Sequence, residues 1–116
     1  MCDNHIHSHL EMQLIYDKFQ QTIEELSATS IKLRQNLEEH KIVLTTLSEV
    51  PSGRKCFRNL GEGLVETTAG EGKVALEKEI KVFEESLNMV EKEFKTKQEE
   101  FAKWKTSNNI KIVKSR

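Results

Sequence analysis

The chain has 116 residues, of which 36% are hydrophobic and 32% are charged, and it contains a single proline. This length fits one domain, and the composition is lean for a globular core but typical of long helices rich in Glu, Lys and Leu. The net charge of −1 gives no overall reason to expect a nucleic acid or a membrane surface as partner.

Residues 1–9 are polar and contain His5, His7 and His9, with Cys2 nearby. These residue types could hold a metal ion, but their spacing matches no zinc module, which needs four ligands on a braced scaffold. We therefore expect a flexible N-terminal tail over residues 1–9, with no metal and no other cofactor. The segment also lacks a basic region followed by an apolar one, so we expect no secretory signal.

The cysteines and the lengths of the apolar stretches indicate the cellular compartment in which the protein works. Cys2 and Cys56 are the two cysteines, and a single pair so placed makes no disulfide framework. No apolar stretch approaches the roughly 18 residues that a membrane-spanning helix needs. We therefore expect a reduced, cytoplasmic location and no membrane partner.

A narrow apolar seam with alternating spacings of four and three residues predicts a coiled-coil helix over residues 10–49. Only Ser30 and His40 interrupt it, and Pro51 and Gly53 follow its end. A lone seam histidine more often specifies register or partner than catalysis, which needs a second positioned group, so we do not expect an enzyme. The seam consists of Met12, Tyr16, Phe19, Ile23, Leu26, Ser30, Leu33, Leu37, His40, Leu44 and Leu47.

Strand-forming residues on both sides of Gly61-Glu62-Gly63 predict a β-hairpin over residues 54–68. A lone two-stranded ribbon is marginal in water and leaves unpaired backbone groups along both edges. Either the hairpin is floppy, or hairpins of other chains complete it, and the second reading gives its apolar side chains a place to bury. The candidate oligomerisation residues are Cys56, Phe57, Leu60, Leu64 and Val65.

A second seam predicts a helix over residues 73–107. Thr68 followed by Glu71 matches a capping box, but Gly70 and Gly72 weaken that turn and move the expected start to Lys73. Two seams of similar length on either side of a hairpin predict a mainly α fold in which the helices form an antiparallel coiled coil. The second seam consists of Leu76, Ile80, Phe83, Leu87, Val90, Phe94, Lys97, Phe101 and Trp104.

The end of the coiled coil away from the hairpin carries many apolar side chains. Exposed apolar patches mark interaction sites, although Phe101 and Trp104 could instead close the end of the seam. A lysine-rich cluster at the same end fits an acidic protein surface, and no nucleic-acid docking motif accompanies it. The candidate binding residues are Leu10, Leu14, Ile15, Phe101, Trp104, Ile110, Ile112 and Val113.

Taken together, these features resemble the β-class subunits of prefoldin over roughly residues 10–113. The stretches that carry the resemblance are Glu39–Leu47, Arg54–Arg58, Gly61 with Leu64–Glu66, and Phe101–Ile112. The resemblance implies one prefoldin-like domain over 10–113, with residues 114–116 as a C-terminal tail.

The same resemblance implies a heterohexamer in which hairpins form a β-barrel body and coiled-coil arms project from it. The ends of the arms would capture unfolded proteins such as actin and tubulin without ATP and deliver them to the cytosolic chaperonin. The alternative reading is a self-associating coiled-coil adaptor or tether, which needs neither an open-edged hairpin nor apolar ends.

Overall fold

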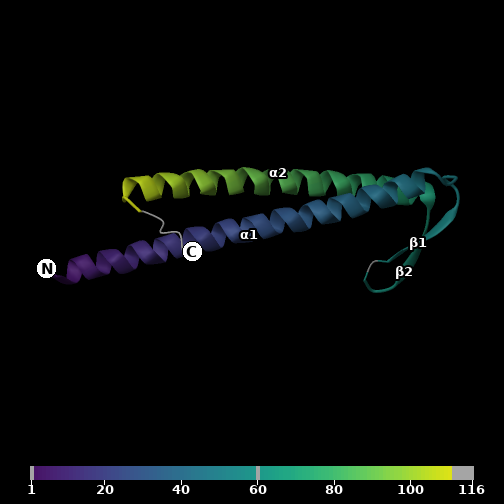
Figure 1. Cartoon of the computed structure of the whole chain (residues 1–116). Coiled ribbons are helices and arrows are strands. Elements are labelled where there is room, and N and C mark those ends of the chain that lie inside the picture. The colour runs from purple at the N-terminus through teal and green to yellow at the C-terminus, as the bar shows by residue number, and fades with distance from the viewer. Residues whose placement is uncertain (1, 60, 111–116) are drawn as a thin grey trace, which may run out of the picture. The chain divides into compact units, whose positions relative to one another are not determined.

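The computed structural model describes residues 2–59 and 61–110, with side chains from His9 onward. Along the chain follow α1 (Cys2–Ser48), β1 (Lys55–Asn59), β2 (Leu64–Thr68) and α2 (Ala69–Ser107), as Figure 1 shows. The predicted mainly α fold, two long helices with a hairpin between them, is confirmed. Its residues group into two compact units, the first made of 1–30 and 89–116 and the second of 31–88, so each helix contributes one segment to each unit.

Helix α1 begins earlier than expected. It starts at Cys2 instead of Leu10, so the segment predicted as a tail is helical from Cys2 on. Residues 2–9 contain neither Gly nor Pro, and without such breakers the helix continues toward the N-terminus. At its other end α1 stops at Ser48, one residue before the expected 49, and Pro51 follows shortly after.

In both units the helix segments pack through the predicted seams. Every seam position from Met12 to Leu47 and from Leu76 to Trp104 is buried or half-buried. Leu37, Ile80 and Phe101 are the most enclosed apolar seam side chains, with only 7–8% of their surface exposed. Ser30, which interrupts the first seam, is also buried at 8% exposure. The alternation of fours and threes therefore identified the core of each unit.

The helix segments of the second unit run antiparallel. A Cβ at Gly72 would lie 3.4 Å from Leu47 Cδ1, so the Leu47 side chain of α1 packs against α2 at the hairpin end. Further along, the ring of His40 meets the ring of Phe83 at 4.9 Å between centroids. As residue numbers fall along α1 they rise along α2, as the predicted antiparallel pair requires.

Helix α2 also begins earlier than expected, at Ala69 instead of Lys73. The Ala69 N–H donates to Arg54 O at 2.8 Å, and the Gly70 N–H donates to Ser52 O at 2.8 Å. The first N–H groups of a helix lack partners inside it, and here carbonyls of the segment before β1 supply them. These bonds offset the helix-weakening effect of glycine, and Ala69 becomes the most buried apolar residue, at 1% exposure.

Thr68 caps α2, as the sequence predicts. Its Oγ1 accepts a hydrogen bond of 3.2 Å from the Glu71 N–H, which is the bond expected from an N-cap threonine. The Glu71 carboxylate accepts a bond of 3.0 Å from the Thr67 hydroxyl. The cap thus links the last two residues of β2 to the first turn of α2, so the strand continues directly into the helix.

Candidate functional site

The hairpin has the turn that its glycines predict. β1 and β2 pair antiparallel, and Gly61 and Gly63 have φ angles of +88° and +148°, which residues with a side chain rarely adopt. Asn59 Oδ1 accepts a hydrogen bond of 2.9 Å from the Gly61 N–H, an Asx turn that closes the loop from within. Leu60, one of the predicted oligomerisation residues, lies outside the described residues.

One face of the hairpin carries two uncovered apolar side chains. Phe57 and Leu64 are 67% and 68% exposed, and the strand register places both on the same face because Phe57 pairs with Glu66 and Leu64 with Asn59. An ion pair of 3.5 Å between Lys55 Nζ and Glu66 Oε1 flanks them. In the part of the chain that the structure describes, each strand pairs only with the other, so each has one open edge. This outer face, with its two open edges, offers a surface for strands from another chain.

The opposite face of the hairpin turns toward the helices of the second unit. Cys56, Arg58 and Thr67 are half-buried there, whereas Val65 on the same face is 48% exposed. A cavity of about 330 Å³ lies between the hairpin and the helices, and Phe57 and Asn59 of the outer face border it as well as the inner face. Its lining comprises His40, Val43, Leu47, Cys56, Phe57, Arg58, Asn59, Thr67, Gly72, Leu76 and Glu79.

Glu79 joins three elements of the second unit. One carboxylate oxygen lies 3.1 Å from His40 Nε2 on α1, and the other pairs with the Arg58 guanidinium on β1. His40 Nδ1 donates to Asn36 O at 2.7 Å, and its ring meets Phe83 edge-on. These contacts agree with the reading of His40 as a polar seam residue. Sequence reasoning missed Glu79 and Arg58, because nothing in their spacing shows that a strand folds beside this turn of α2.

Four aromatic rings form the core of the first unit near the start of the α1 seam. The Phe101 ring lies 5.2 Å from that of Tyr16 and 5.1 Å from that of Phe19, and Trp104 lies 5.9 Å from Phe19. Lys105 Nζ sits 4.3 Å above the Phe101 ring, within range of a cation–π contact. With 8% of its surface exposed, Phe101 belongs to the packing between the helices and not to an open surface. Its placement fits the alternative that this ring closes the seam.

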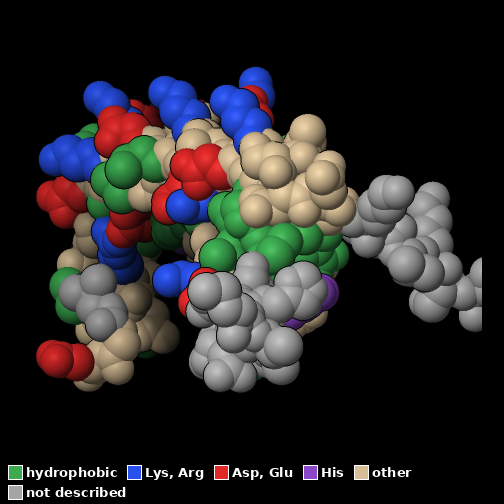
Figure 2. All heavy atoms as spheres, turned by 90° about the vertical axis from the view of Figure 1, so that its left-hand side faces the viewer, with side chains coloured by type: hydrophobic (Ala, Val, Ile, Leu, Met, Phe, Trp, Pro, Cys, Tyr) green, Lys and Arg blue, Asp and Glu red, His purple; other side chains and the backbone are tan. Residues whose placement is uncertain are grey.

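The other predicted binding residues differ in exposure. Leu10, Leu14 and Ile15 are 57%, 69% and 41% exposed on α1, whereas Trp104 and Ile110 are half-buried. Ile112 and Val113 lie outside the described residues. Figure 2, which views the side where α1 begins and α2 ends, shows a cluster of hydrophobic side chains and, along the upper edge, Lys and Arg side chains mixed with Asp and Glu.

Ile110 is held by the end of α2. Asn109 has a φ of +53°, its N–H donates to Thr106 O at 3.3 Å, and the Ile110 N–H donates to Lys105 O at 2.9 Å. This pair of bonds is a Schellman motif, which fixes the residue after the helix end. The described backbone therefore places Ile110 directly beyond the last turn of α2.

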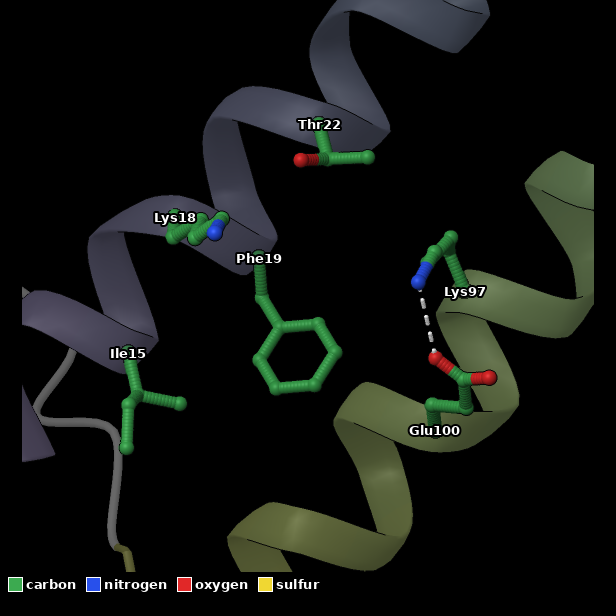
Figure 3. Close-up of a pocket in the computed structure, with 6 residues that line it drawn as sticks. All are labelled: Ile15, Lys18, Phe19, Thr22, Lys97 and Glu100. Atoms are coloured by element: carbon green, nitrogen blue, oxygen red, sulfur yellow. Dashed lines mark hydrogen bonds and ion pairs between the residues drawn. The ribbon is translucent and has the colours of Figure 1, made fainter.

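A shallow cavity of about 240 Å³ lies beside the aromatic cluster (Figure 3). One side is lined by α1, through Ile15, Lys18, Phe19 and Thr22. The other side is lined by Lys97 and Glu100 of α2, which form an ion pair of 3.1 Å with each other. The Phe19 ring points from α1 toward α2. Apolar carbon thus lies next to a polar rim, an arrangement suited to weak contact with a partner chain.

Neither a metal cluster nor a membrane span is found in the described part of the chain. The search of these residues gives no group of three or more His, Cys, Asp or Glu that could hold a metal ion. The side chains of His5 and His7 lie outside it. Among the helices of the same residues, none is long and apolar enough to cross a membrane.

Comparison with known proteins adds a family. Residues 11–115 match the family model described as "Prefoldin subunit". The chain is 33% identical to Prefoldin subunit 2 of Saccharomyces cerevisiae over 103 residues, covering 89% of this chain and 93% of the yeast protein. It is 29% identical to Prefoldin subunit 2 of Homo sapiens over 98 residues, covering 84% of this chain and 64% of the human protein.

Solved structures agree on the fold. The prefoldin beta subunit from Thermococcus strain KS-1 superposes with a TM-score of 0.75 at 21% identity, covering 84% of this chain and 86% of that one. The prefoldin beta2 subunit from the same strain gives a TM-score of 0.69 at 20% identity, covering 79% of this chain and 98% of that one.

Proposed function

This chain belongs to the prefoldin subunit family, and from that membership we propose that it is one subunit of a cytoplasmic, heterohexameric chaperone that works without ATP. Family membership implies a chaperone subunit that assembles with other prefoldin subunits. In the proposed role the assembly captures unfolded proteins such as actin and tubulin and transfers them to the cytosolic chaperonin.

The uncovered hairpin face is the observation that carries the assembly proposal. Phe57 and Leu64 are about two-thirds exposed, and both strands of the described sheet have an open edge. Fully burying side chains of this size contributes about 1.5–3 kcal/mol each, and strand addition pairs the backbone groups as well. Hairpins of other subunits would supply both the cover for these side chains and the partners for these backbone groups. A coiled-coil tether would need neither.

Client capture is proposed for the apolar side chains at the start of α1. Leu10, Leu14 and Ile15 are exposed, and unfolded chains offer matching apolar surface. Each contact is weak, but several subunits acting on one client raise the overall affinity by multivalency. Trp104, Ile110, Ile112 and Val113 complete the proposed surface, whereas Phe101 acts by supporting it from within.

The test replaces the three exposed residues in the assembled complex, as Leu10→Ser, Leu14→Ser and Ile15→Ser together. We expect suppression of aggregation of chemically unfolded actin to fall severalfold, because each lost apolar contact costs up to about 1 kcal/mol of client affinity. The aggregation of actin is measured by light scattering as the actin is diluted from denaturant into the chaperone solution.

The matched control is Ile42→Ser with Val82→Ser, two side chains that are 59% and 60% exposed in the second unit. This control should suppress aggregation as well as the wild type does. Equal suppression by the triple variant and the wild type would remove the start of α1 from the client-binding surface.

A further inference from the structure

We propose that Glu79 is a positioning residue that sets the pose of the hairpin by pairing its carboxylate with Arg58 of β1, beside the ring of His40 on α1. The consequence for subunit assembly rests on the proposed function, whereas the positioning itself concerns this chain alone. We call His40, Arg58 and Glu79 the Glu79 cluster.

The geometry gives Glu79 this role. A two-stranded ribbon has little packing of its own, and it joins the helices only through short connections at residues 49–54 and 68–69. Of the ion pairs assigned among the described residues, the Arg58–Glu79 pair links the hairpin to a helix, whereas Lys55–Glu66 stays within the hairpin. The base of the ribbon is held by the bonds of Thr67 and Thr68 to Glu71. Further along the ribbon, its pose depends on the Arg58–Glu79 pair and on the contacts of the half-buried inner face.

The carboxylate also has a fixed neighbour on α1. His40 Nε2 lies 3.1 Å from Glu79 Oε2, while its Nδ1 donates to Asn36 O at 2.7 Å and Phe83 packs against its ring. The His40 ring, fixed by Asn36 O and Phe83, limits the positions that the neighbouring Glu79 side chain can take, which lowers the entropy lost when Arg58 binds. His40 and Glu79 side chains are 28% and 34% exposed, and that of Arg58 is 37% exposed, so water screens the cluster only in part.

Cys56 provides a natural reporter of the hairpin pose. It lies two residues before Arg58 on the same strand, is half-buried, and lines the cavity beneath the hairpin. A hairpin released from Glu79 exposes this thiol more often, and the rate of alkylation follows the exposed fraction. Together with circular dichroism, this readout separates a change of hairpin pose from a general loss of helix structure.

The experiment measures alkylation of Cys56 by iodoacetamide in the full chain carrying Cys2→Ser, so that one thiol reacts. Glu79→Gln and Arg58→Gln are each expected to raise the rate about fivefold, the size that loss of a partly exposed ion pair allows. The double variant should react no faster than either single one, because both remove the same interaction. Circular dichroism checks that helix content is unchanged.

Glu85→Gln is the matched control, since it removes an acidic side chain from an exposed position of α2 in the same unit. It should leave the Cys56 rate unchanged. An unchanged rate in Glu79→Gln, or effects that multiply in the double variant, would overturn the positioning role.

A second readout connects the pose to assembly. When the chain is mixed with the other prefoldin subunits, Glu79→Gln should weaken complex formation about fivefold in a native mass titration. Normal assembly by a variant with raised Cys56 reactivity would overturn the link to assembly. If wild-type chain fails to assemble at all, the proposed function falls, while the Cys56 rates still decide the role of Glu79.

Discussion

Phe101 and Phe57 are the same residue type in opposite environments. Phe101 is 8% exposed among the rings of the first unit, whereas Phe57 is 67% exposed on the hairpin of the second unit. At Phe101 the chain itself supplies both sides of the contact, from α1 and from α2. At Phe57 the described chain supplies one side only, and we propose that the hairpins of other subunits supply the other. Burial by its own chain marks a residue that stabilises this subunit, and exposure on an open sheet marks one that serves association.

The largest expected effect separates the two phenylalanines by stability. Phe101→Ala should lower the free energy of unfolding by about 3 kcal/mol, because it removes a buried ring and leaves a cavity. Phe57→Ala in the isolated chain should change it by less than about 0.5 kcal/mol, as is usual for exposed positions. Urea unfolding followed by circular dichroism measures both, and equal losses would contradict the contrast.

The second prediction concerns association with other subunits, for which the exposed hairpin residues should matter most. Phe57→Ser with Leu64→Ser should weaken binding to other prefoldin subunits about a hundredfold, since two apolar side chains lose their burial at the interface. Native mass spectrometry of mixed subunits gives the populations. Ile42→Ser with Val82→Ser serves as control, and a homodimer of the wild type that ignores other subunits would favour a tether.

The smallest expected effect compares two glycines in the first turn of α2, each of which would gain one methyl group. A Cβ at Gly70 would lie 3.2 Å from both Cβ and O of Ser52, whereas a Cβ at Gly72 would lie 3.4 Å from the flexible end of Leu47. Gly72→Ala should therefore stabilise the chain by up to about 1 kcal/mol through helix propensity. Gly70→Ala should gain nothing, because its contact is with backbone that also holds the Gly70 N–H. Thermal unfolding compares the two, and an equal gain would show that Ser52 moves aside freely.

The sequence predicted those parts of the fold that depend on local periodicity. The fours and threes from Met12 to Leu47 identified the buried face of α1, and the glycines around Glu62 identified the turn. The start of α2 was misplaced because the bond from the Gly70 N–H to Ser52 O joins residues 18 positions apart. No propensity scale includes such a bond.

The candidate site was predictable to a smaller extent. Exposure of Leu10, Leu14 and Phe57 followed from their places off the seam or on a lone ribbon. Phe101 stands in the second seam, which already indicated that it could close the seam, and the rings of Tyr16 and Phe19 enclose it there. The Glu79 cluster was out of reach, since it combines a strand, a seam histidine and a residue beside the second seam.

The hydrogen bond between Asn59 and Gly61 has a consequence for how fast and how tightly a neighbouring chain can add its strand. The bond from the Gly61 N–H to the Asn59 side chain already restricts the backbone torsions of the turn. The hairpin therefore loses less conformational entropy when a neighbouring strand binds. The template is in this sense folded before its partner arrives, and recognition can proceed by rigid fit instead of by folding on contact.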